Sequence, residues 1–296
     1  MSFSNLMRSL ESKKFTITGE IDPPKGADRE AVIRQARLLK DHVAAANVTD
    51  NPLGIMFMGG LACCAIMQNE VGLEAVYQVT CRDRNRIALQ SDVLGAAALG
   101  IRNVLALTGD HPSLGDHPQA KPVFDLDSVQ LTAMLRKMVD EKTDLAGNKL
   151  NVAPQLHIGV ALSPGLSPLE PEIIKLEKKI KAGAEFAQTQ VVYDANVMEK
   201  LREAIAHLDI PVLVGIAPLK SLGMAKFMAK NVPGVTIPEQ MMKRLESSKN
   251  IKETTIDITA DLLRNIKEIG FAGAHIMPVG MDEAVGEIIK RSGVRG

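Results

Sequence analysis

Two carboxylates in this sequence stand where acid–base chemistry is feasible, each just after an apolar, β-branched run. Glu20 lies in FTITGEIDPP and Asp110 lies in NVLALTGDHP. The two prolines after Glu20 offer its carboxyl group no backbone N–H, and a poorly solvated carboxyl group keeps its proton to higher pH. Glu20 is therefore suited to act as a general acid near neutral pH. The alternative is a rim carboxylate paired with a lysine or an arginine.

Asp110 and Gln190 suit two complementary tasks. Asp110 follows a glycine that lets the backbone approach a ligand closely. As the second of two separated carboxylates, it could stay ionised and favour positive charge on a substrate, or it could simply cap a turn or a helix. Gln190 ends the run FAQTQVV, where its amide could contact the edge of a heterocycle or form a structural hydrogen bond between strands.

Basic residues follow two other apolar runs. The run CRDRNR at 81–86 contains three arginines, and KLEKKIKAGA at 175–184 contains four lysines. Such groups can hold a phosphate or a carboxylate. Local Asp–Arg pairs explain the first run almost as well, and a solvated helix face is the usual explanation for the second.

These residues need elements to position them, and the whole chain alternates short β-branched runs with amphipathic segments. We expect strands at 14–21, 45–49, 74–80, 103–108, 156–162, 186–193, 211–217 and 273–279. We expect helices at 28–42, 55–70, 85–99, 127–142, 169–182, 195–208, 221–230 and 281–292. Asp28 and Asp194 precede two of these helices as N-cap residues.

The pattern predicts a (β/α)8 TIM barrel that forms a single domain over residues 1–296. Strands such as VLALTG and VLVGIAP are apolar at consecutive positions, which is typical of parallel strands covered on both faces. Segment 233–265 predicts extra helices before the last strand. An open doubly wound sheet is the alternative, although no GxGxxG follows the first strand. In a barrel the polar residues that end the strands would meet at one mouth.

Composition and charge exclude several classes of function. Lys plus Arg and Asp plus Glu both number 35, which gives no electrostatic case for binding nucleic acid or an anionic membrane. The N-terminal residues lack the apolar core of a signal peptide and no run is long enough to span a bilayer, so we expect a cytoplasmic protein. Cys63, Cys64 and Cys81 have no metal-ligand spacing, and we expect no metal site.

The order of short motifs resembles that of the flavin-dependent methylenetetrahydrofolate reductases. GEIDPP, NVTD, LTGD, KAGAEFAQTQ and GIAP fall in turn along the chain, at the first, second, fourth, sixth and seventh strands. The resemblance implies a flavin at the barrel mouth with folate stacked on it. Hydride transfer would then convert 5,10-methylenetetrahydrofolate to 5-methyltetrahydrofolate.

The same resemblance implies roles for individual residues. Glu20 matches the acid that protonates the departing nitrogen when the imidazolidine ring opens, Asp110 the carboxylate near flavin and pterin, and Gln190 the pterin contact. Leu222 falls in the substrate site. The residues that would line the FAD site are Thr49, Gln78, Thr108, Asp110, Phe124, Glu172, Lys175, Lys178 and Lys179.

Departures from the family pattern bear on the cofactor and on the electron donor. Gln78 stands where many members have His and Thr108 where many have Arg, so FMN is an alternative to FAD. Leu222 stands where well-studied members have a Phe that stacks on nicotinamide and folate, and HIMPVG lacks their Asn-Arg ending. The chain looks like the short form that works with an electron-donating partner subunit, in an oligomer.

Two other functions stay open at this level. One is a folate- or pterin-binding or methyl-transfer subunit without its own redox cofactor. The other is a flavin-free reductase on the same barrel that uses a diffusible deazaflavin.

Overall fold

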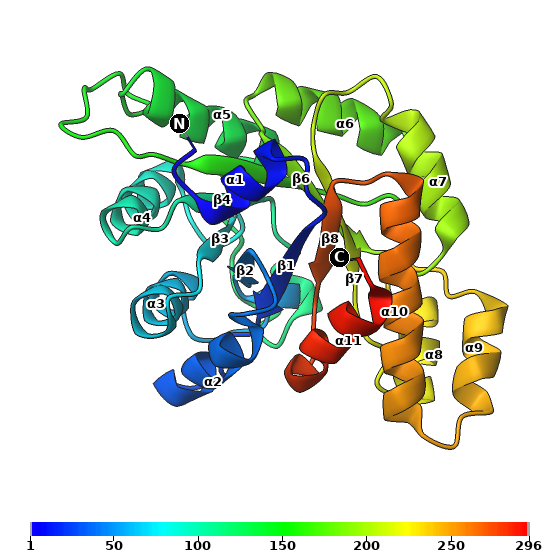
Figure 1. The fold of residues 1–296 in the computed structure, drawn as a ribbon. Helices are drawn as coiled ribbons and strands as arrows, with labels where there is room; N and C mark the ends of the chain where they lie inside the picture. The colour runs from blue at the N-terminus through cyan, green and yellow to red at the C-terminus, as the bar shows by residue number, and fades with distance from the viewer. Residues whose placement is uncertain (1, 295–296) are drawn as a thin grey trace.

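Eight parallel strands close into a barrel in chain order, with β1 pairing with both β2 and β8 (Figure 1). This computed structural model describes residues 2–294 of the chain. The strands are β1 (Thr16–Ile21), β2 (Ala45–Val48), β3 (Ala75–Thr80), β4 (Asn103–Leu107), β5 (His157–Leu162), β6 (Phe186–Val191), β7 (Val212–Ile216) and β8 (Gly273–Ile276).

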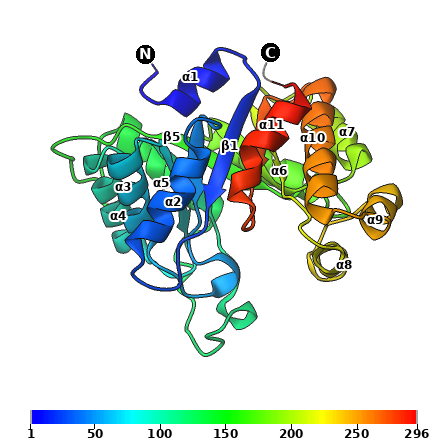
Figure 2. The same ribbon diagram turned by 60° about the horizontal axis from the view of Figure 1, so that its bottom comes forward.

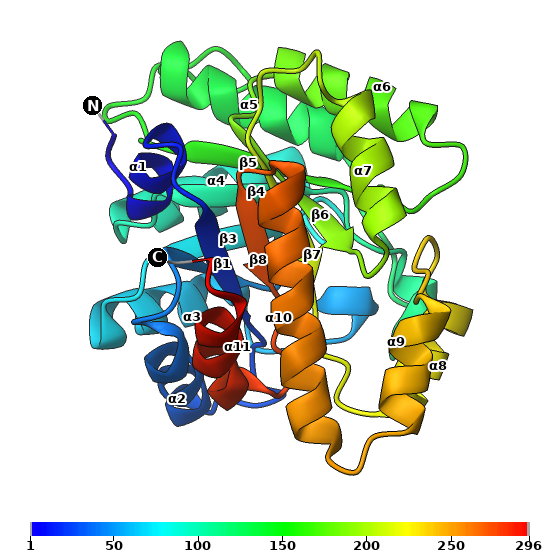
Figure 3. The same cartoon turned by 45° about the vertical axis from the view of Figure 1, so that its right-hand side comes forward.

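Helices surround the barrel and cover the outer face of its strands (Figures 1 and 3). The α-helices are α1 (Asn5–Glu11), α2 (Arg29–Leu39), α3 (Gly60–Ile66), α4 (Arg86–Ala98), α5 (Ser128–Asp140), α6 (Glu170–Lys181), α7 (Ala195–Ala204), α8 (Leu222–Asn231), α9 (Glu239–Glu246), α10 (Ile251–Ile269) and α11 (Val285–Ser292). Short helical turns are η1 (Pro52–Gly54), η2 (Met67–Val71), η3 (Pro112–Leu114) and η4 (Asp282–Ala284).

The predicted barrel with extra helices before its last strand is confirmed. Between β7 and β8 the chain forms α8, α9 and the long helix α10, and Figure 3 shows α8 and α9 beside α10. The N-cap predictions also hold, because the side chains of Asp28 and Asp194 accept hydrogen bonds from backbone N–H groups in the first turns of α2 and α7.

Two boundaries differ from expectation for local reasons. The helix expected from residue 55 begins at Gly60, because the chain before it forms the turn η1 and an irregular segment. It ends in the π-helical turn η2. The strand expected to reach residue 279 ends at Ile276. Pro278 supplies no backbone N–H, and Val279 has a φ of 50°, which no strand can accommodate.

The floor of the barrel is apolar and closed. Leu6 of α1 is fully buried against inward-facing side chains that include Phe186 and Leu213. Gly159 makes room for the Phe186 ring, since a Cβ at that glycine would lie 2.2 Å from the ring atom Cζ. Figure 2 shows α1 at the end of the barrel where β1 begins. The opposite, carboxyl end is therefore the one left open for a site.

Candidate active site

A cavity of about 440 Å³ opens at the carboxyl end of the barrel. Its volume lies within the roughly 300–1,000 Å³ typical of small-molecule sites. Its walls include polar residues from β1, β3, β6 and β8 and apolar residues from β4. The residues expected at the site that line this cavity are Glu20, Thr49, Gln78, Thr108, Asp110, Glu172, Lys175, Lys179 and Gln190.

Three other expected residues lie outside the lining of this cavity. The ring of Phe124 stacks on that of His111, with 6.2 Å between centroids. Lys178 is exposed on α6, and Leu222 is half-buried at the start of α8, packed against the outer core. These three residues could reach a ligand only where it extends beyond the cavity.

Glu20 stands at the cavity wall with its side chain 15% exposed. Its Oε2 accepts a hydrogen bond from Nε2 of Gln78 at 3.1 Å and lies 3.3 Å from Nε2 of His275. Within residues 2–294 the basic side chain beside Glu20 is therefore the imidazole of His275, and no lysine or arginine pairs with it. No backbone N–H of the described residues donates to Glu20, but β3 and β8 bring two side-chain donors that are remote in sequence.

A column of buried polar side chains runs from Glu20 into the barrel. Nδ1 of His275 lies 3.0 Å from Oγ1 of Thr18, which also accepts a hydrogen bond from Nε2 of Gln188 at 3.2 Å. Gln188 in turn exchanges two hydrogen bonds with Asn47, at 2.6 and 3.3 Å. The residues below Glu20 are all buried, and their mutual pairing avoids the cost of unsatisfied polar groups.

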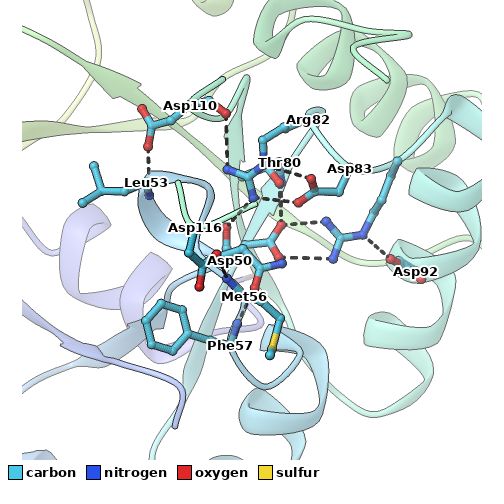
Figure 4. Close-up of polar contacts among 12 residues, drawn as sticks. Asp50, Leu53, Met56, Phe57, Thr80, Arg82, Asp83, Asp92, Asp110 and Asp116 are labelled. Atoms are coloured by element: carbon cyan, nitrogen blue, oxygen red, sulfur yellow. Dashed lines mark hydrogen bonds and ion pairs between the residues drawn. The ribbon is translucent and has the colours of Figure 1, made fainter. Parts of the chain in front are cut away.

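Asp110 is held by the loops that cross the mouth (Figure 4). Its Oδ2 accepts a hydrogen bond from the backbone N–H of Leu53 at 3.1 Å, and its carbonyl oxygen accepts one from Arg82 at 3.4 Å. Gly109 has a φ of 90°, and a Cβ there would lie 3.0 Å from Cβ of both Arg82 and Thr80. Only glycine meets both constraints, so the turn that presents Asp110 is tightly specified.

Asp50 anchors the frame of the site beneath these loops (Figure 4). Its side chain is 1% exposed and accepts hydrogen bonds from the N–H and the hydroxyl of Thr80, at 2.9 and 2.8 Å. Arg84 adds a bidentate contact at 2.7 and 3.2 Å. Burial alone would lower the pKa of Arg84, but the hydrogen bond and charge of Asp50 raise it above its usual value.

The three arginines of the run at 81–86 form ion pairs with aspartates. Arg82 is 2% exposed and pairs with Asp83, Arg84 pairs with Asp50, and Arg86 pairs with an aspartate in the loop before α5. The arrangement matches the alternative of local Asp–Arg pairs. Their charges are thus already compensated, and they hold the mouth together.

Lysines bring positive charge to the far side of the cavity. Lys179 is 4% exposed, and its Nζ donates a hydrogen bond to the carbonyl oxygen of Ala161 at 2.6 Å. Burial, together with the neighbouring charge of Lys175, lowers the pKa of Lys179 to about 8. Glu172 lies at the same end and accepts a hydrogen bond from the backbone N–H of Ser163.

The cavity has features that fit the expected flavin. Oγ1 of Thr49 is buried without a hydrogen-bond partner among the described residues, so it is available to a ligand. Leu105, Leu107 and Met277 provide apolar wall, and Lys179 provides a cation. A flat heterocycle with an anionic tail satisfies these three features together.

Sequence reasoning missed the members of the polar column as functional candidates. Each of them lies two positions before a residue that lines the cavity, and alternate residues of a strand face the same side. They are Thr18, Asn47, Gln188 and His275. This alternation identifies which side chains face inward. It contains no information on which of them pair across the barrel.

The described residues hold no group of three or more His, Cys, Asp or Glu side chains placed to bind a metal ion. The three cysteines are buried, and burial raises the pKa of Cys63 to about 11 and of Cys81 to about 12. Across the same part of the chain, each helix is too short or too polar to cross a bilayer.

A family model described as methylenetetrahydrofolate reductase matches residues 5–293. Methylenetetrahydrofolate reductase 2 of Schizosaccharomyces pombe is 27% identical over 237 residues, which span 75% of this chain but only 36% of the yeast protein. The 5,10-methylenetetrahydrofolate reductase of Salmonella typhimurium is 26% identical over 235 residues, covering 77% of this chain and 73% of that enzyme.

Among solved structures, an uncharacterized protein from Clostridium thermocellum that binds two copies of 5-methyl-5,6,7,8-tetrahydrofolic acid superposes with a TM-score of 0.67. The match covers 98% of this chain and 99% of that one, at 13% sequence identity. A 2,3-dimethylmalate lyase superposes with a TM-score of 0.54 at 11% identity, covering 96% and 82% of the two chains. At these low sequence identities, the superpositions show a shared fold only.

The Asp50 frame generates a stability prediction. Asp50→Ala leaves Arg84 half-buried without its main partner, and breaking a buried pair costs about 3–5 kcal/mol of unfolding free energy. The control is Glu239→Ala, which removes an 80% exposed partner of Lys243 and should cost at most about 1 kcal/mol. Urea unfolding followed by circular dichroism measures both, and equal losses would contradict the assigned role of Asp50.

Proposed function

The chain belongs to the methylenetetrahydrofolate reductase family, and from that premise we propose that it reduces 5,10-methylenetetrahydrofolate to 5-methyltetrahydrofolate. The observation that carries the proposal is the shared cavity: Glu20 and Asp110 line one opening at the carboxyl end of the barrel. Gln190 lines the same cavity, where its amide can contact the pterin edge.

In this proposal Glu20 is the general acid. Ring opening of the substrate needs a proton for the nitrogen that departs from the one-carbon unit. The hydrogen bond from Gln78 and the contact with His275 fix the direction of the Glu20 carboxyl group. A carboxyl group that is already oriented needs no rearrangement when the proton is transferred.

Asp110 is assigned to the positive charge that ring opening creates on the substrate. Its hydrogen bond from the N–H of Leu53 fixes one carboxylate oxygen, and the cavity brings the other within reach of a ligand. Opposite unit charges about 4 Å apart attract by ~4 kcal/mol at an effective dielectric constant near 20. That attraction favours the open, cationic form of the one-carbon unit over the closed ring.

The proposed cofactor is FAD, with FMN as the alternative, and when bound it supplies the hydride. Thr49 and Thr108 provide polar contacts from the strand ends. Lys175 and Lys179 provide positive charge for the phosphate groups of a flavin nucleotide. Phe124, Lys178 and Leu222 are assigned to parts of the cofactor or substrate that extend beyond the cavity.

Electrons are proposed to come from a separate donor subunit in an oligomer. The support is the sequence itself: Leu222 stands in place of the aromatic residue expected to stack on nicotinamide, and the eighth strand lacks an Asn-Arg ending. Copurified polypeptides with redox centres would identify such a donor.

The proposed function is tested by the colour and redox behaviour of the purified chain. Protein reconstituted with FAD or FMN should show flavin absorbance, lose it on treatment with dithionite and regain it when methylenetetrahydrofolate is added. Product analysis should then find 5-methyltetrahydrofolate. A chain that binds folate but takes up neither flavin would overturn the proposal in favour of a folate-binding or methyl-transfer subunit.

Glu20→Gln tests the acid. The amide keeps the shape of the side chain but has no acidic proton to donate, so turnover of methylenetetrahydrofolate should fall by about 10²–10⁴-fold, with flavin affinity unchanged. Dithionite-reduced enzyme mixed with substrate in a stopped-flow instrument measures the loss. Glu30→Gln, an exposed exchange on α2, serves as the control. Retained turnover in Glu20→Gln would remove Glu20 as the acid.

Lys179 generates a pH prediction for flavin binding. With a pKa of about 8, its side chain is cationic below pH 8 and neutral above it, so affinity for an anionic flavin nucleotide should fall as pH rises from 7 to 9.5. Flavin fluorescence titrations measure the affinity. Lys179→Met should bind more weakly at pH 7 and lose this pH dependence, whereas the exposed exchange Lys181→Met should keep it. An unchanged pH profile in Lys179→Met would rule out a contact with the phosphate.

A further inference from the structure

The two carboxyl oxygens of Glu20 have different surroundings. Oε2 receives the hydrogen bond from Gln78 and faces Nε2 of His275. Oε1 has no hydrogen bond within the described part of the chain, while Glu20 itself lines the cavity. A proton on Oε2 would compete with two groups already directed at that oxygen, whereas a proton on Oε1 meets no such competition.

The buried column determines what His275 presents to Oε2. Because Nε2 of Gln188 donates to Oγ1 of Thr18, the hydroxyl hydrogen of Thr18 is free to point at Nδ1 of His275. The paired hydrogen bonds with Asn47 hold the Gln188 amide in the orientation this requires. With Nδ1 as acceptor, the neutral imidazole carries its hydrogen on Nε2, directed at Glu20.

We infer that His275 is a positioning residue: held as the Nε2–H tautomer by Thr18, it fixes Oε2 of Glu20 and leaves Oε1 to carry the transferable proton. The inference deepens the proposed function, since it rests on Glu20 being the acid. During ring opening the proton moves from Oε1 to the departing substrate nitrogen. The carboxylate left behind keeps two N–H donors on Oε2, and hydrogen bonds to an ionised oxygen are the strong ones.

The inference explains why polar side chains occupy the buried centre of the barrel, where apolar side chains could also fill the space. The floor of the same barrel is filled by apolar side chains such as Leu213 and Phe186. Two residues further along β2 and β6, the inward positions hold Asn47 and Gln188, which are hydrogen-bonded to each other and to Thr18. Fully satisfied buried networks have fixed geometry, and this one ends on the carboxyl group of the acid.

The tautomer can be measured without any turnover. Nuclear magnetic resonance of the flavin-loaded protein labelled with ¹⁵N-histidine distinguishes Nε2–H from Nδ1–H, and loss of one set of signals in His275→Gln assigns His275. Wild type and Thr18→Ser should show Nε2–H. Thr18→Val keeps the shape but removes the hydroxyl and should lose this preference. An Nδ1–H ring in wild type, or unchanged signals in Thr18→Val, would overturn the inference.

The rate of folate reduction in variants provides a second test of the inference. Thr18→Val should lower the rate of folate reduction by about 10- to 100-fold with unchanged flavin affinity, and Thr18→Ser should restore it. His275→Gln, which retains an N–H donor, should keep more activity than His275→Leu. Thr16→Val is the matched control, a buried exchange on the same strand whose hydroxyl bonds Ser9 at the floor, and should leave the rate unchanged.

The outcomes separate the inference from the proposed function. Full activity in Thr18→Val, alongside an active wild type, defeats the positioning role alone. A wild type that binds flavin but never reduces the substrate defeats the proposed function, and the tautomer measurement still decides the state of His275. Thermal melting of each variant identifies any loss of activity that comes from unfolding.

Discussion

The hydrogen-bonded column beneath Glu20 is the interaction on which the site depends. A closed parallel barrel directs every second residue of each strand inward, and an inward polar group must find a partner inside the barrel. Here the inward positions change from apolar at the floor to paired amides, a threonine and a histidine, and then to carboxylates at the mouth. Glu20 therefore sits on a support with fixed geometry, at the boundary between the packed interior and the cavity.

A second constraint acts at the rim, where loops after β2, β3 and β4 are held together by charge. Asp50 links the end of β2 to Thr80 and Arg84, and Arg82 reaches the carbonyl oxygens of Asp50 and Asp110. Backbone strain collects in the same region: Leu53 and Phe124 have positive φ angles of 57° and 41°. Strained residues persist only where their surroundings hold them, and the Asp–Arg pairs provide that hold beside Asp110.

Much of the fold could be predicted from the sequence because its signals are local. Consecutive apolar residues in VLALTG and VLVGIAP indicate strands covered on both faces, and aspartates such as Asp28 indicate helix starts. The candidate site was predictable only as far as strand ends could be located. The pairing of His275 with Thr18 joins residues 257 positions apart, and the bulge of β6 near Gln190 depends on β7; neither has a local signal. Leu222 and Phe124 were expected at the site by resemblance alone, and they lie outside the cavity lining.

The carboxyl group of Glu20 is kept from backbone N–H donors, and its orientation is fixed by side-chain donors. Pro23 and Pro24 supply no backbone N–H in the segment after Glu20, and the donors that reach its carboxyl group are side chains from other strands. Gln78 and His275 fill that role from either side, and both contact Oε2. Side-chain donors anchored in the barrel interior make the two oxygens unequal, and that inequality fits the role of directed proton donor proposed for Glu20.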